Sequence, residues 1–178
     1  AQNLYGPFPV CVVSGPRTLL KNCAPTDRKI ESGDLLFLDI EPEYAGYGTD
    51  LARVMKVEGF AEGDELNFLE CARLGLLAAV EATRPGKSIG EVEEKALEVG
   101  DAMGYRGRYY LKCHGLGTSK FRDVPRPVQK NYILRSGETI NYESILLDEK
   151  YGGATLEDTV LVTDSAYEVL SRCEHRWW

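Results

Sequence analysis

The chain has 178 residues, 43% of them hydrophobic, which is enough to bury the core of one domain and short for two. Its net charge of −7 makes nucleic acids and anionic membranes poor partners, and no apolar run approaches the length that crosses a bilayer. Five scattered cysteines without a CxxC pair argue against a disulfide framework or a zinc knuckle and predict reduced thiols in the cytoplasm.

Three short strands are expected in the first third of the sequence. Phe8 to Ser14 is apolar and ends at the turn Ser14-Gly15-Pro16. Leu35 to Glu41 is almost wholly apolar, which is typical of a strand covered on both faces. A third strand is expected from about Thr49 to Val57.

The apolar residues then change to helical spacing. Those from Leu66 to Val80 predict a helix that Pro85-Gly86 ends. A second helix is predicted to open with the capping box Ser88-Ile89-Gly90-Glu91 and to end at Gly104. Strands are expected again at residues 109–113, 139–147 and 156–163. Helices between two groups of strands predict an α+β domain with helices on one face of a curved sheet.

The sequence also contains an internal repeat. The segment SGDLLFLD, which ends at Asp39, is echoed by SGETINYE, which ends at Glu143. Downstream, TDLARV around Asp50 is mirrored by LEDTVL around Glu157. The repeat predicts two similar half-domains, each with one hairpin and two carboxylates.

Each hairpin is expected to place its two acids opposite each other. Asp39 would pair with Asp50 around a turn near Tyr44-Ala45, and Glu143 would pair with Glu157. Directly opposed residues have Cβ atoms about 5 Å apart, so two bare carboxylates would repel and raise each other's pKa. For any one acid, simple solvation at a strand end is the alternative. The duplicated pattern within apolar strands favours bound cations.

Each of the two histidines carries information. His114 is followed by Gly115 and Gly117, which let another group approach closely, although a purely structural histidine is the alternative. His175 lies in the C-terminal tail and is expected at the surface. Four carboxylates and one imidazole form an oxygen-rich ligand set that suits Mn²⁺, Fe²⁺ or Co²⁺, with Zn²⁺ as a further candidate. Acids from both halves could bridge two ions roughly 3.5–4 Å apart.

In chain order these residues resemble the Asp-Asp-His-Glu-Glu ligand set of the pita-bread metallopeptidases, the peptidase M24 type that includes creatinases, prolidases, aminopeptidase P and methionine aminopeptidases. The positions that match are Asp39, Asp50, His114, Glu143 and Glu157. The likeness runs from about Phe8 to Leu170. It implies a pita-bread α+β fold, with a pseudo-twofold curved antiparallel sheet and helices on the outer face. Residues 1–178 would form a single catalytic domain that lacks the family's usual N-terminal helices or N-terminal domain.

The resemblance implies a dinuclear metal-dependent hydrolase similar to Xaa-Pro peptidases, acting on a small peptide or other small molecule. Two divalent ions would activate a water molecule for attack on a peptide or amide carbonyl. Glu143 matches the family's ligand and general base, and His114 is the other residue predicted to be catalytic. A homodimer or a covering N-terminal segment is the expected partner.

The sequence departs from the family where the substrate is handled. Phe121 and Arg122 stand where the family has a histidine followed by Glu, and Asn22 replaces a further histidine. These three are therefore the candidate substrate-binding residues. Losing one donor to the substrate carbonyl can cost on the order of 10²–10³ in rate. Two alternatives therefore stay open: a metal-dependent lyase of the same fold, similar to the dimethylsulfoniopropionate lyases, and a non-catalytic binding module.

Overall fold

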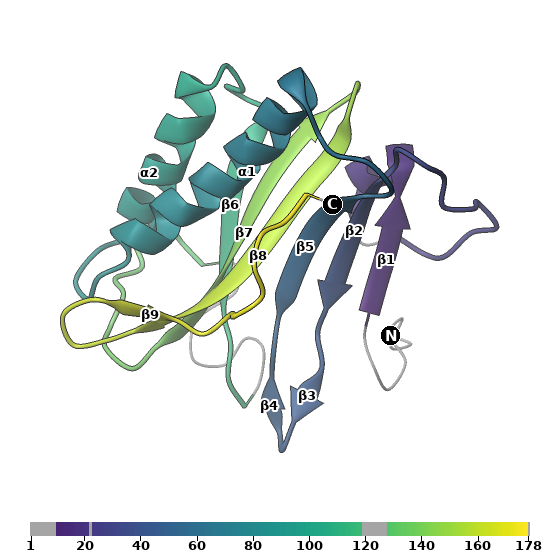
Figure 1. Ribbon diagram of the computed structural model, residues 1–178. Helices are drawn as coiled ribbons and strands as arrows, with labels where there is room; N and C mark the ends of the chain where they lie inside the picture. Colours follow the sequence, from purple (N-terminus) through teal and green to yellow (C-terminus); the bar gives the residue numbers. More distant parts are fainter. Residues whose placement is uncertain (1–9, 22, 119–127, 178) are drawn as a thin grey trace.

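The computed structural model describes residues 10–21, 23–118 and 128–177, and within them two larger antiparallel sheets and one two-stranded ribbon. The first sheet has the strand order β1-β2-β5, with β1 (Val10–Ser14), β2 (Leu35–Ile40) and β5 (Leu51–Lys56). The second has the order β6-β7-β8-β9, with β6 (Tyr109–Gly115), β7 (Thr139–Asp148), β8 (Gly152–Val162) and β9 (Tyr167–Val169). The two sheets lie side by side, with β5 next to β8 (Figure 1).

Two α-helices cover one face of the second sheet (Figure 1). They are α1 (Gly63–Ala82), which packs on β7 and β8, and α2 (Ile89–Ala102), which packs on α1 and β6. Gly100 makes this packing close, because a Cβ there would lie 2.9 Å from the ring of Tyr109. In the described part of the chain, neither helix is both long and apolar enough to span a membrane. The predicted α+β class, with helices on one face, is confirmed.

The predicted register of the β7–β8 hairpin is correct, and that of the first hairpin, between β2 and β5, is wrong. Glu143 pairs with Glu157, but Asp39 pairs with Ala52 instead of Asp50. The tight turn decides this, because the two residues with positive φ are Ala45 and Gly46, one position later than expected. Moving the turn by one residue shifts each cross-strand partner by two.

Four short elements were not predicted. They are the 3-10 helix η1 (Gly15–Leu20), the two-stranded ribbon of β3 (Glu43–Tyr44) and β4 (Tyr47–Gly48), and β9. The strands β3, β4 and β9 have only two or three residues each, too few for an alternating pattern to emerge, and η1 begins within the predicted turn at Gly15-Pro16. The longer predicted strands and both helices are present, with ends displaced by a few residues. Phe8, at the predicted start of the first strand, lies outside the described residues.

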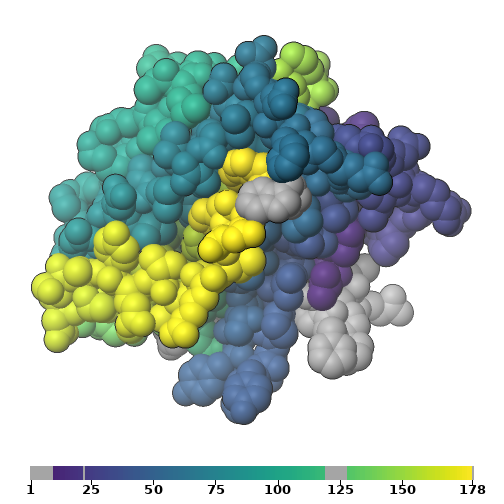
Figure 2. Space-filling model, in the orientation of Figure 1, coloured from purple at the N-terminus to yellow at the C-terminus, as the bar shows by residue number. Residues whose placement is uncertain are grey.

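The C-terminal segment after β9 crosses the outside of the molecule beside α1 and β5 (Figures 1 and 2). Trp177 is buried there, and its indole N–H donates to Glu70 of α1 at 2.7 Å. The expected surface position of His175 is wrong: its side chain is only 12% exposed and lies 3.1 Å from Asp158 of β8. The tail therefore forms part of the fold that supports β8.

The capping box at the start of α2 leads to a stability prediction. The predicted capping box is present, with the Ser88 hydroxyl accepting from the Glu91 N–H and the Glu91 carboxylate accepting from the Ser88 N–H. Replacing Ser88 with Ala should lower the free energy of unfolding by about 1 kcal/mol, because an N–H of the first turn loses its acceptor. Ser165→Ala, in the exposed turn before β9, should change it by less than about 0.5 kcal/mol. Urea denaturation measures both, and equal midpoints would contradict the prediction.

Candidate metal centre

The five residues predicted as ligands come from both sheets and are all buried. Asp39 lies on β2, Asp50 directly precedes β5, His114 lies on β6, and Glu143 and Glu157 pair across β7 and β8. Their exposed fractions range from 2% to 7%. Four carboxylates held this far from water need positive charge or hydrogen-bond donors nearby.

His114 joins the carboxylates of the two halves. Its Nε2 lies 3.1 Å from Asp50 Oδ2 and 3.5 Å from Glu143 Oε1. Its other ring nitrogen, Nδ1, lies 3.1 Å from the Gly115 carbonyl oxygen. An N–H on Nδ1 would fix the ring and leave Nε2 as the atom that faces the acids. The predicted convergence of His114 with acids from both halves is therefore present.

The first half contributes a third acid that was not predicted. Carboxylate oxygens of Asp39, Glu41 and Asp50 all lie within 4.8 Å of one another. Glu41 is two residues from Asp39, so both side chains leave the same face of the chain. Asp39 and Asp50 thus approach each other although they are not directly opposed in the ladder.

A lysine occupies the other side of the centre. The ammonium group of Lys21, at the end of η1, forms an ion pair with Glu143 Oε2 and lies 3.0 Å from Glu157 Oε1. The remaining oxygen of Glu157 accepts from the Asn141 side-chain N–H at 3.0 Å. Both oxygens of Glu157 therefore have donors, one of them a cation.

The pKa shifts follow from this burial and charge. Burial raises the pKa of Glu157 well above its ordinary value; Lys21 opposes the rise, and the negative charges of Asp50 and Glu143 add to it. Burial alone would lower the pKa of Lys21, but the charges of Glu157 and Glu143 outweigh it and raise that pKa. The donor set of buried oxygens and one imidazole, which already attracts an ammonium ion, fits divalent cations.

The backbone around Glu157 is held from the first sheet. The buried guanidinium group of Arg53, on β5, donates to the Glu157 carbonyl oxygen at 2.7 Å and to the Asp158 carboxylate at 2.7 Å. It also donates to the Cys173 carbonyl oxygen in the C-terminal segment at 2.6 Å. Arg53 thus ties both sheets and the tail together directly behind one of the candidate ligands.

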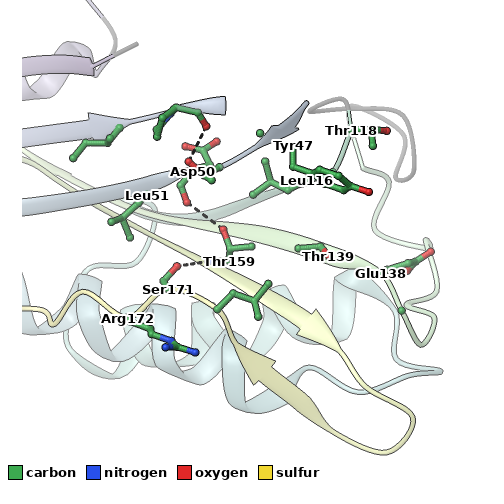
Figure 3. Close-up of a pocket in the computed structure, with 17 residues that line it drawn as sticks. Tyr47, Asp50, Leu51, Leu116, Thr118, Glu138, Thr139, Thr159, Ser171 and Arg172 are labelled. Carbon is green, nitrogen blue, oxygen red and sulfur yellow. Dashed lines mark hydrogen bonds between the residues drawn. The ribbon is translucent and has the colours of Figure 1, made fainter. Parts of the chain in front are cut away.

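Two cavities adjoin the centre. One of about 380 Å³ is lined by His114 and Glu143, together with Lys112, Lys130 and Glu93. A second cavity, of about 720 Å³, has Asp50 in its lining but none of the other four candidate ligands (Figure 3). In its wall, the Thr159 hydroxyl donates to the Asp50 carbonyl oxygen at 3.1 Å, which joins β8 to the start of β5. The smaller cavity gives a ligand access to the predicted catalytic pair.

The candidate substrate-binding residues Asn22, Phe121 and Arg122 lie outside the described residues. Lys21 and Glu41 were not predicted from the sequence. Only Glu41 had a local sequence pattern that could have identified it. Glu41 follows Asp39 at a spacing of two, which a strand pattern could have identified. Lys21 is 136 residues from Glu157, and nothing local in the sequence indicates that contact.

Comparison with known proteins identifies the family. Residues 2–164 match the profile of metallopeptidase family M24. The Xaa-Pro dipeptidase of Pyrococcus furiosus is 31% identical over 170 residues, which cover 94% of this chain and 48% of that protein. A solved prolidase structure from Pyrococcus furiosus superposes with a TM-score of 0.85 at 29% identity, over 93% of this chain and 49% of the other.

The X-Pro aminopeptidase structure from Thermotoga maritima, at 20% identity, shares the fold with a TM-score of 0.87, over 96% of this chain and 49% of the other. The chain spans about half the length of the curated relatives that it matches. The prolidase neighbours confirm the predicted pita-bread fold. With its family profile matched over most of its residues, this chain belongs to metallopeptidase family M24.

Proposed function

We propose that this chain forms a single catalytic domain of a metal-dependent hydrolase that cleaves a peptide or amide bond, as the names of its Xaa-Pro dipeptidase relatives indicate for those proteins. The observation that carries the proposal is the convergence of His114 with buried acids from both sheets, Asp50 at 3.1 Å and Glu143 at 3.5 Å. A solvated set of surface acids would not be buried to this degree.

Asp39, Asp50, His114, Glu143 and Glu157 would hold two divalent ions, with Mn, Co or Fe expected and Zn as a further candidate. When bound, such ions polarise a carbonyl and lower the pKa of water, which supplies a nucleophile near neutral pH. The burial of the five side chains supports this assignment, because a low-dielectric site strengthens their attraction to cations.

Glu143 would act as the general base and move a proton from the attacking water towards the leaving amine. Its position supports this role, since it lines the 380 Å³ cavity and pairs with His114. His114, the other residue predicted to be catalytic, would hold a metal ion through Nε2 and orient Glu143 and Asp50. The substrate would be a small peptide, and Asn22, Phe121 and Arg122 remain the residues proposed to contact it.

The same domain could support a lyase, in which a base removes a proton from carbon instead of activating water, or a binding module without chemistry.

We also propose that a homodimer partner or a covering N-terminal segment packs on this domain. Val10 and Val12, on one face of β1, are 48% and 49% exposed and offer an apolar surface for either. We propose a cytoplasmic location, which suits five cysteines that form no disulfide.

The test combines metal content with product analysis. The protein is purified without added metal, reconstituted separately with Mn²⁺, Co²⁺, Fe²⁺ and Zn²⁺, and incubated with Xaa-Pro dipeptides and with dimethylsulfoniopropionate. We expect metal uptake and proline release that EDTA abolishes. Asp39→Ala should lose both, whereas Asp164→Ala, an exposed acid after β8, should retain both. Alkene release without proline would instead support the lyase, and failure to bind any metal would support the binding module.

A further inference from the structure

Lys21 places a positive charge among the acids proposed to bind metal. Its ammonium group pairs with Glu143 and lies 3.0 Å from Glu157 Oε1, the two acids of the second sheet. We propose that Lys21 is a built-in competitor for one of two metal positions: it holds Glu143 and Glu157 in the metal-free chain and has to leave before a second ion binds. This inference rests on the proposed function, because it presupposes a metal centre.

The position of Lys21 is set by the fold. It ends η1, which is fixed to the β7–β8 hairpin by a hydrogen bond from the Gly153 N–H to the Thr18 hydroxyl at 2.8 Å. A Cβ on Gly153 would collide with the Thr18 backbone, so glycine is what permits this approach. Lys21 itself has φ 46° and ψ −143°, a backbone conformation that is strained for a non-glycine residue. A strained backbone at the point where a lysine enters the site indicates that the surrounding contacts hold it there.

The contacts divide the centre into two sides. Asp39, Glu41 and Asp50 form a cluster of oxygens within 4.8 Å of one another, contributed by the first sheet. Glu143 and Glu157 form the side that Lys21 contacts. His114 lies between the two sides, near Asp50 and Glu143. In this proposal the first divalent ion would bind at the Asp39–Asp50 side, away from the two acids that Lys21 contacts.

On the Lys21 side, the oxygens that would bind metal are already used. Glu157 accepts from Lys21 through Oε1 and from Asn141 through Oε2, and Glu143 Oε2 accepts from Lys21. An ammonium group has three donors and a full charge, so it satisfies these carboxylates much as a cation does. Lys21 and a divalent ion would also repel each other at this distance, since both are positive. Occupation of this side by one excludes the other.

The experiment compares metal binding by the wild-type chain, Lys21→Met and Lys21→Gln. Calorimetric titration with Mn²⁺ should give a first ion with similar affinity in all three proteins. The second ion should bind at least roughly tenfold more tightly to both variants, because no charge-assisted hydrogen bonds have to be broken. In the absence of metal, both variants should melt at least about 4 °C below the wild type, since their buried acids lose a cation.

Lys56→Met is the matched control, because Lys56 is 19% exposed and pairs with Glu65 at the base of α1, away from the centre. It should leave both metal affinities unchanged. Equal affinity for the second ion in the wild type and both Lys21 variants would overturn the competition while leaving the proposed function in place. Absence of metal binding by every protein, Lys21 variants included, would overturn the proposed function and the competition with it.

Discussion

Replacing Glu143 with Gln is expected to lower kcat/KM for Xaa-Pro substrates by about 10²–10⁴, because the amide cannot accept the proton that the proposed general base receives. The change conserves size, so the β7–β8 pairing of Glu143 with Glu157 should persist. Rates of proline release across a range of substrate concentrations, with the protein loaded with Mn²⁺, provide the measurement.

Glu143 also contacts Lys21 and His114, so metal content has to be measured in the same samples. Glu168→Gln, on the exposed strand β9, controls for the loss of one negative charge and should retain full activity. Proline release at the wild-type rate by metal-loaded Glu143→Gln protein would exclude Glu143 as the base. A loss of activity fully explained by a loss of metal would make it a ligand only.

Replacing Arg53 with Met should lower the free energy of unfolding by about 3–5 kcal/mol, the usual cost of leaving one partner of a buried ion pair alone. Arg53 is 6% exposed, and its loss would remove the arginine partner of the Asp158 carboxylate and a donor to the carbonyl groups of Glu157 and Cys173. Methionine fills similar volume, so the effect would arise mainly from charge and hydrogen bonds. Urea denaturation of the metal-free protein measures it.

Arg73→Met is the matched control for this prediction. Arg73 pairs with Glu70 three residues earlier on α1, with side chains 29% and 27% exposed, and such pairs contribute about 0–1 kcal/mol. The two variants remove the same charge from different environments. Denaturation midpoints that fall equally in both would show that burial of Arg53 adds nothing.

Sequence patterns predicted the parts of this fold that depend on neighbouring residues. The helical period from Leu66 to Val80 and the capping box at Ser88 each express a local preference, and α1 and α2 form there. The repeated acidic motifs likewise located the ligand candidates, because strand alternation fixes which side chains share a face. Glu143 and Glu157 face each other as predicted.

Features that depend on distant residues were missed or misjudged. The register of the hairpin between β2 and β5 depends on which two residues adopt positive φ. Alanine rarely adopts positive φ, so the sequence did not indicate that Ala45 would be one of them. The Lys21–Glu157 contact and the packing of His175 against Asp158 arise only when segments far apart in the chain come together. Local propensity carries no information about such contacts, and the ligand assignment itself stays a prediction.

The centre's contacts also have a consequence for folding kinetics. Lys21 and Glu157 are 136 residues apart, and Arg53 is 104 residues from the Glu157 carbonyl group that it binds. Closing loops of this length costs chain entropy before any contact compensates for it, so these interactions should form late. A spectroscopic probe at the centre would then remain silent while helices and hairpins form and would respond only when the two sheets join.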